Sequence, residues 1–270
     1  MHEEQWPWRQ LYNQIHEKPD AQVHPQIIEP WLDEYPGEAE WLKAFSARSE
    51  CPWPAAEVTD LWRLFAASMV FETLALGLIP GSMYPNGWTG PRIALDEFRA
   101  FAIALGFNVV TPATYSPFDV EVTGLMTSAD DREAVQMLRT HWPCLMLGPM
   151  LFMRCGAIVR APASQLRIGI ADEAPLYWAS ARKTRPVCNL SQGWGSNSRW
   201  RTSFRRDYRI DGVLHFNVDA PYDLAMGLIP PDCDMNLQQC REIVINRSYV
   251  VTDSPSEDLW PYDFRLSMPA

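Results

Sequence analysis

The chain has 270 residues, of which 47% are apolar and 21% charged, and its 23 basic against 33 acidic side chains give a formal net charge of −10. These are the values of a globular protein, so they exclude intrinsic disorder over most of the length. A chain that is negative overall repels nucleic-acid phosphates, which argues against non-specific nucleic-acid binding. The longest apolar stretch, Cys144 to Val159, contains Arg154 and is too short to span a bilayer, so we expect no membrane association.

The first eight residues contain no basic start followed by an apolar run, so we predict no secretory signal and a cytoplasmic location. The six cysteines form no Cys-x-x-Cys pair, and no His lies beside them at ligand spacing. We therefore expect reduced thiols, no metal site and no cofactor.

Helical spacing of apolar residues dominates the first third of the chain. It is found over Trp6–Ile15 and over Ile27–Phe45, where two prolines interrupt it. The next segment, Ala55–Leu78, is apolar on nearly every side. It predicts a central buried helix that ends near Gly77.

A loop rich in Gly, Pro and Asn runs from Ile79 to Pro91 and is a candidate domain boundary. It would divide the chain into a helical region, 1–90, and an α+β region, 91–270, although one continuous domain is the alternative. Beyond the loop we predict a helix over Ala94–Leu105, ended by Gly106, and a strand over Asn108–Thr111.

Two further helices are predicted from capping residues. Ser128 can cap a helix over Ala129–Thr140, whose first turn is rich in acidic residues, and Asp234 can cap one over Met235–Asn246. Short apolar runs between turn residues predict strands at Cys144–Leu147, Gly156–Arg160, Leu166–Ile170, Leu176–Ala179 and Tyr249–Thr252. The fold class expected is α+β, with a helical N-terminal part packed on a mainly antiparallel β-sheet in the C-terminal part.

The most unusual feature of the sequence is a cationic segment between Ser180 and Arg209. It contains eight basic residues and one acidic residue, about +7, whereas the remaining 15 basic and 32 acidic residues carry about −17. Such an asymmetry is typical of a site for an anion or for a binding partner. The alternative is that the arginines form ion pairs inside the protein.

A β-hairpin is predicted at the end of this segment, because Asp211-Gly212 separates two apolar runs. A two-residue loop would place Asp207 and Arg209 on the same face as Leu214 and Phe216, which buries charge against apolar side chains. We therefore predict a three-residue loop, Ile210-Asp211-Gly212, with Asp207 opposite His215.

The glycines of the sequence Gly193-Trp-Gly-Ser-Asn-Ser allow backbone N–H groups to converge, and arginines follow them. The predicted site for an anion or a partner consists of Trp194, Asn197, Arg199, Arg201, Arg205 and Arg209. His215 and Asp207 are the candidate proton-transfer pair if the protein is an enzyme. An ordinary cross-strand ion pair is the structural alternative.

Three functions compete at this point. The first is a non-enzymatic acidic binding protein, of the bacterial immunity or antitoxin type, that neutralises a basic protein partner such as a toxin. The second is an enzyme acting on a small phosphorylated or carboxylated substrate held by the arginines. The third, a single-stranded nucleic-acid site with Trp194 and Trp200 stacking on bases, is opposed by the negative charge elsewhere.

Overall fold

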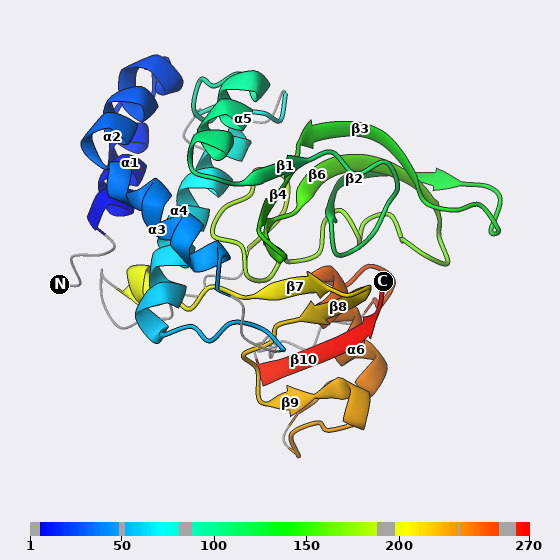
Figure 1. The fold of residues 1–270 in the computed structure, drawn as a ribbon. Coiled ribbons are helices and arrows are strands. Elements are labelled where there is room, and N and C mark those ends of the chain that lie inside the picture. The colour runs from blue at the N-terminus through cyan, green and yellow to red at the C-terminus, as the bar shows by residue number, and fades with distance from the viewer. Residues whose placement is uncertain (1–5, 49–51, 81–87, 188–197, 232, 254–262) are drawn as a thin grey trace.

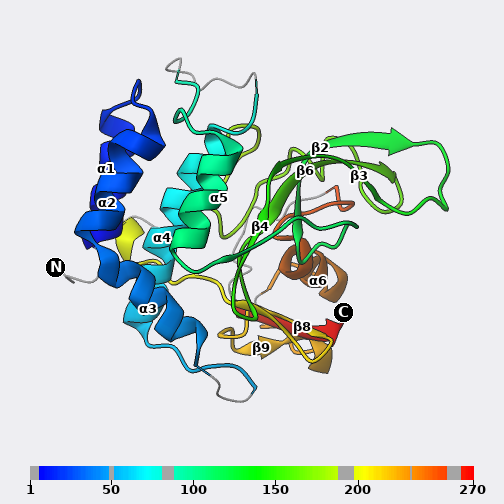
Figure 2. The ribbon, with the colours of Figure 1, turned by 45° about the horizontal axis from the view of Figure 1, so that its top comes forward.

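The computed structural model describes residues 6–48, 52–80, 88–187, 198–231, 233–253 and 263–270. Helices α1 to α5 lie together on one side of the molecule, and α6 lies apart from them, near the C-terminus (Figures 1 and 2). The α-helices are α1 (Trp6–Glu17), α2 (Glu29–Glu34), α3 (Pro36–Ser46), α4 (Val58–Leu76), α5 (Leu95–Ala104) and α6 (Leu237–Asn246). Shorter helical turns are η2 (His24–Ile28), η3 (Ser198–Arg201) and η4 (Leu224–Met226).

The strands form a seven-stranded sheet, ordered β1-β4-β5-β7-β8-β10-β9, and a three-stranded sheet, ordered β2-β6-β3. Pairs are antiparallel except for β2 with β6 and β9 with β10, which are parallel. The strands are β1 (Asn108–Val110), β2 (Val120–Ser128), β3 (Gln136–Trp142), β4 (Cys144–Leu147), β5 (Met150–Met153), β6 (Cys155–Pro162), β7 (Asp207–Ile210), β8 (Val213–Phe216), β9 (Tyr222–Asp223) and β10 (Phe264–Pro269). This is the predicted α+β arrangement, with helices in the N-terminal part and a mostly antiparallel sheet in the C-terminal part.

The chain crosses from one sheet to the other at two places, and at each place a single residue separates the two strands. Pro143 separates β3 from β4, and Arg154 separates β5 from β6. The Trp142 indole N–H donates to the Arg154 carbonyl at 2.8 Å, which ties these two crossing points together. Gly156 is required beside them, because a Cβ there would lie 2.3 Å from the buried Trp142 ring.

The central strands β4 and β5 of the seven-stranded sheet are buried on both faces. On β4, Leu145 and Leu147 belong to a core shared with the helices, whereas Cys144 and Met146 belong to a second core shared with α6 and the three-stranded sheet. We call these the helical core and the distal core. The alternation continues on β5, where Leu151 faces the distal core.

Helix α4 is the centre of the helical core, as the apolar segment at 55–78 predicts. From Leu64 to Leu76 every residue of the helix is buried, and the helix is followed by Gly77. At its start the backbone N–H of Glu57 donates to the Asp60 carboxylate at 3.2 Å. The prediction of a helix over Ala94–Leu105 is also confirmed by α5, and Gly106 ends it with a φ of +90°.

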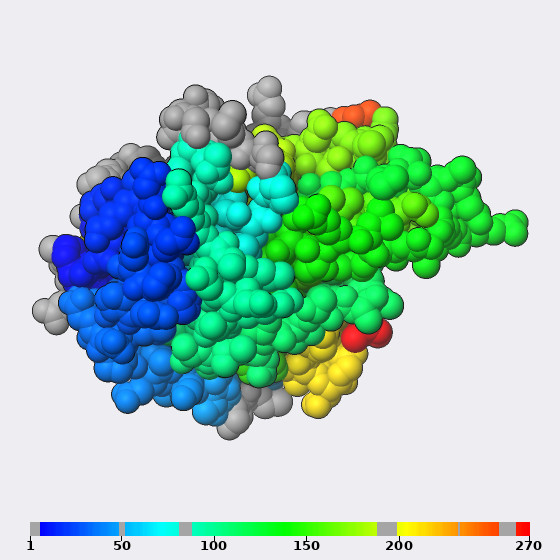
Figure 3. All heavy atoms as spheres, turned by 90° about the horizontal axis from the view of Figure 1, so that it is seen from above, coloured from blue at the N-terminus to red at the C-terminus, as the bar shows by residue number. Residues whose placement is uncertain are grey.

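The predicted helix over Ala129–Thr140 is wrong. Residues 120–128 and 136–142 form β2 and β3, and a turn joins them. The acidic residues that suggested a helix start belong to this turn, where Asp130 accepts the backbone N–H of Arg132 at 2.9 Å. The two strands and β6 form an arm that projects from the molecule (Figure 3).

Other predicted elements differ in detail. Leu166–Ile170 and Tyr249–Thr252 are not strands, and Leu176–Ala179 contributes only a bridge from Leu176 to Val187. Helix α6 is capped by Asn236 rather than by Asp234, since the Asn236 side chain accepts the backbone N–H of Gln239 at 3.0 Å. Among the described helices, none is both long and apolar enough to cross a membrane.

Candidate functional site

The predicted hairpin is β7–β8, but its register differs from the prediction. Ile210 pairs with Val213 and Tyr208 with His215, so the loop has two residues, Asp211 and Gly212. Both have positive φ, +49° and +76°, as a type I′ turn requires. The predicted three-residue loop and the pairing of Asp207 with His215 are therefore wrong.

The prediction failed because it assumed a single buried face for the hairpin. Tyr208 faces the helical core, and Leu214 and Phe216 face the distal core. Asp207 and Arg205 are buried beside the distal core, with relative exposures of 1% and 4%. Burying this charge is costly unless it is paired, and the structure supplies the partners.

Asp207 is the centre of a buried triad with two arginines. Its Oδ1 accepts from Arg205 Nε, and its Oδ2 accepts from Arg247 Nη2, both at 2.8 Å. Burial opposes ionisation, but the two guanidinium groups outweigh it and lower the pKa of Asp207. Arg205 also donates to the Val244 carbonyl at the end of α6, at 2.6 Å. The triad thus fixes β7 to α6.

The other arginines of the predicted site do not converge with Arg205. Arg199, in η3, donates to the Tyr12 hydroxyl at 2.9 Å, and Arg201 lies over the Trp62 ring at 5.9 Å. Arg209 pairs with Asp119 at 2.5 Å. Trp194 and Asn197 lie outside the described residues, so the binding role of the set stays a prediction.

The proposed proton-transfer pair is not assembled. Asp207 is buried beside the distal core, whereas His215 is partly exposed and contacts Ser267 Oγ at 2.8 Å and the Trp53 ring at 5.4 Å. Burial lowers the pKa of His215. The sequence placed these residues together only through the incorrect register.

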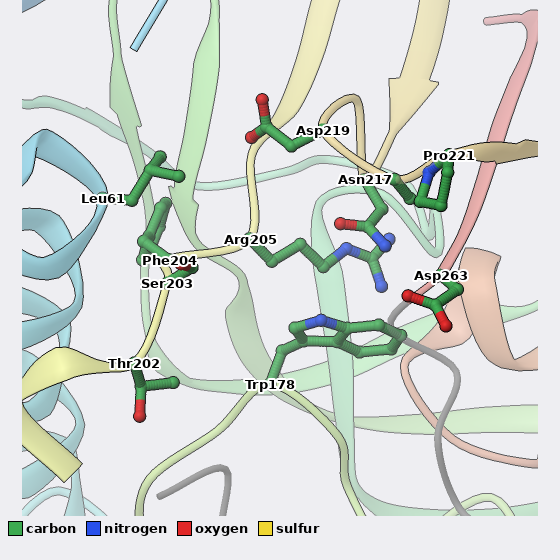
Figure 4. A pocket seen from close by; sticks show the side chains of 11 residues that line it. Leu61, Trp178, Thr202, Ser203, Phe204, Arg205, Asn217, Asp219, Pro221 and Asp263 are labelled. Atoms are coloured by element: carbon green, nitrogen blue, oxygen red, sulfur yellow. The ribbon is translucent and has the colours of Figure 1, made fainter. Parts of the chain in front are cut away.

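A cavity of about 330 Å³ lies beside the triad. In Figure 4 the Arg205 side chain extends between Asn217 and the Trp178 ring, with Asp219 and Asp263 on either side. The guanidinium carbon is 4.3 Å from the Trp178 ring centroid. The remaining lining residues are Leu61, Thr202, Ser203, Phe204, Ala220 and Pro221.

Two polar atoms at this cavity, Arg205 Nη1 and Thr202 Oγ1, are buried and have no hydrogen-bond partner within the described part of the chain. Two lining residues also have left-handed backbone conformations, Trp178 with a φ of +55° and Asn217 with +52°. Asn tolerates this region, but a Trp there is strained, and such strain is concentrated at functional sites. These features make the cavity the candidate functional site.

The triad continues into a larger buried network, which we call the charged seam. Arg182 donates to both carboxylate oxygens of Glu121, at 2.7 and 2.8 Å, and lies 3.6 Å from Glu72 on α4. The Arg154 guanidinium is 3.9 Å from Glu121. The seam consists of Glu72, Glu121, Arg154, Arg182, Arg185, Arg205, Asp207 and Arg247.

Glu121 and Arg154 show how strongly the seam charges interact. Burial alone would raise the pKa of Glu121, but Arg182 beside it, with help from Arg154, brings this pKa to about 2. Burial and the neighbouring Arg247 lower the pKa of Arg154 to about 9. The Arg185 guanidinium donates to the carbonyls of Ala171, Val122 and Ala174.

The sequence interpretation missed Trp178 and most of the seam. Glu72 and Arg154 did carry a signal, because each is a charged residue inside an apolar run, where a charge must find a partner when the run is buried. No local signal in the sequence marked Glu121 or Trp178. The partner of Glu121 is Arg182, 61 residues away, and that of Trp178 is Arg205, 27 residues away.

Among the described residues, no group of three or more His, Cys, Asp or Glu side chains is arranged to hold a metal ion. Comparison with protein families, with curated proteins and with solved structures finds no match for this chain.

Proposed function

We propose that the protein is an acidic binding protein, of the immunity or antitoxin type, which neutralises a basic protein partner by capturing a basic side chain in the cavity beside Trp178. The observation that carries this proposal is the Asp263 carboxylate beside the Trp178 ring at the cavity, whose other carboxylate, that of Asp219, is already paired with Arg206. A pocket of this kind is what an anchoring Arg or Lys of a partner occupies at a protein interface.

The distribution of charge supports the same proposal. Among the residues that the structure describes, the buried charged side chains are five acids and five arginines, so they do not contribute to the net charge of −10. Three arginines of the cationic segment, Arg185, Arg205 and Arg206, are among the buried ones, and the last two are each paired with an aspartate. The segment therefore contributes less positive charge to the surface than its composition indicates, which favours association with a basic partner.

The test is co-expression of the chain with the product of the neighbouring gene, followed by co-purification and measurement of the affinity at increasing salt. We expect a stoichiometric complex and protection of growth. Asp263→Asn should weaken the complex about tenfold at low salt, mostly through the association rate. Asp131→Asn, the same change on the β2–β3 turn, is the matched control. A neighbour that neither binds nor is neutralised would refute the proposal.

A small anionic ligand in the same cavity is the second candidate, because Arg205 Nη1 has no hydrogen-bond partner among the described residues. A carboxylate or phosphate oxygen could accept from Arg205 Nη1, whereas Thr202 lies at the other end of the cavity lining in Figure 4. Calorimetric titration with inorganic phosphate and with succinate tests this candidate. Thr202→Val, at the other end of the cavity, is the control and should leave this binding unchanged, and no heat of binding from either anion would exclude the candidate.

A further inference from the structure

A second, much smaller cavity lies in the middle of the charged seam. It holds about 10 Å³, which is close to the space that a single water-sized particle needs. Three arginines, Arg154, Arg182 and Arg247, and two glutamates, Glu72 and Glu121, contribute to its walls. A polyatomic anion such as phosphate is too large for this space.

The seam has more positive than negative charge. Among the described residues its five arginines are opposed by its three carboxylates and by Asp172, which acts on Arg185, so an excess of one positive charge remains in a buried region. All three carboxylates already interact with arginines: Asp207 with two, Glu121 with Arg182, and Glu72 with Arg182 at 3.6 Å. An uncompensated buried charge is strongly unfavourable, so the seam favours the entry of a negative charge.

Arg154 is where the excess is greatest. One of its nitrogens donates to the Asn246 carbonyl at 2.7 Å, and its nearest carboxylate, that of Glu121, is 3.9 Å away. Its neighbours Arg247 and Arg205 repel its charge, and together with burial they lower the pKa of Arg154 to about 9. A water molecule in the cavity would offer hydrogen bonds but would leave this repulsion in place.

We propose that the small cavity between Arg154, Arg182 and Arg247 binds one monatomic anion, chloride under ordinary conditions. The anion would bridge α4, the crossing point between the two sheets and the end of α6. It would therefore stabilise the junction between the helical core and the distal core. This site is separate from the cavity beside Trp178 and does not depend on the proposed function.

Crystals grown in bromide in place of chloride provide the direct test. We expect an anomalous bromide peak in the cavity within reach of the three guanidinium groups. A water molecule there, with no anomalous signal at high bromide concentration, would overturn the proposal. This measurement uses the unmodified protein, so it does not depend on whether a variant folds.

Thermal unfolding of the full chain gives a second test. Replacing gluconate by chloride at constant ionic strength should raise Tm by about 3 °C, because an anion that binds only the folded state stabilises it. Glu72→Gln removes one negative charge from the cavity wall, so the difference in Tm between chloride and gluconate should increase. Arg154→Met removes a positive charge that holds the anion and should abolish this difference. Arg92→Met, at an arginine that is 58% exposed, is the control and should leave it unchanged. Equal Tm values in the two salts would contradict the proposal.

Discussion

Phe71 and Glu72 are neighbours on α4, yet they belong to two regions that are stabilised in different ways. The Phe71 ring contacts those of Phe98, Phe101, Phe107 and Phe152, with centroids 5.0 to 5.7 Å apart. The Glu72 carboxylate instead accepts hydrogen bonds from the Ser180 hydroxyl and the backbone of residues 180 and 181, in the charged seam.

The difference concerns how each region responds to the loss of one group. An aromatic cluster is held by non-directional contacts, so its stability falls in proportion to the volume removed. A buried ionic network depends on every partner, because one missing charge leaves another uncompensated. We therefore expect graded effects in the aromatic cluster and all-or-none effects in the seam.

The largest effect is expected for Asp207→Asn. The change is nearly isosteric, but it removes the countercharge of Arg205 and Arg247, so it should lower the free energy of unfolding by about 4 kcal/mol. Asp207→Ala should cost about as much, since the lost charge rather than the lost volume dominates. Urea denaturation at pH 7 measures both. A loss under about 1 kcal/mol for Asp207→Asn would show that the seam does not depend on this charge.

In the aromatic cluster, Phe71→Ala should lower the free energy of unfolding by about 3 kcal/mol, through lost transfer energy and the cavity that remains. Phe71→Leu removes less volume, so its free energy of unfolding should lie between that of Phe71→Ala and that of the unmodified protein. The pair is compared by urea denaturation under the same conditions as the Asp207 variants. Equal losses for Leu and Ala would break the proposed contrast, because the cluster would then respond as the seam does.

The sequence predicted the helical half well because its signals are local. The apolar face of α1, the apolar run of α4 and the capping glycine after α5 can each be recognised within one turn or two of the chain. The α+β class followed from the same local patterns. The β2–β3 region was misread because the acidic turn at Asp130 imitates the start of a helix, and the apolar runs at Leu166–Ile170 and Tyr249–Thr252 were misread as strands.

The hairpin and the seam could not be predicted because they depend on what lies on both sides of the sheet. An alternating pattern identifies one buried face, but Tyr208 and Phe216 are buried on opposite faces. Arg205 and Asp207 appeared to belong on the surface because the groups that pair with them, the Val244 carbonyl and Arg247, lie at the end of α6 and directly after it, far away in the sequence. The composition therefore identified the unusual cationic segment but could not show which of its arginines are buried and which are exposed.

The pH dependence separates the two regions further. The pKa of Glu121 falls from 4.5 to about 2 on folding, through Arg182 beside it and against the opposing effect of burial. The unfolded chain thus binds more protons between these values, so this stabilisation is complete above pH 4.5 and is lost as the pH falls towards 2. Between pH 6 and pH 3 the loss should be about 2 kcal/mol.

Urea denaturation across this range checks the expectation, and Glu121→Gln provides the comparison. The variant should be less stable than the unmodified protein at pH 6. Between pH 6 and pH 3 its free energy of unfolding should fall by about 2 kcal/mol less than that of the unmodified protein, because the Glu121 contribution is absent. Phe71→Ala should keep the full acid dependence of the unmodified protein. If the free energy of unfolding of Glu121→Gln falls with pH as steeply as that of the unmodified protein, the titration does not belong to Glu121.

The smallest effect is expected for the ion pair of Arg209 with Asp119, on the same hairpin as the triad. Its 2.5 Å separation is as short as any in the seam, but Arg209 is 42% exposed, so water screens the pair. Arg209→Gln should change the free energy of unfolding by less than about 1 kcal/mol, most of it from the lost contact with the Phe118 ring. Repeating the urea titration in 1 M NaCl should reduce the effect further, whereas the effect of Asp207→Asn should persist. A loss for Arg209→Gln as large as that for Asp207→Asn would mean that ion-pair distance, and not burial, determines the stability of this hairpin.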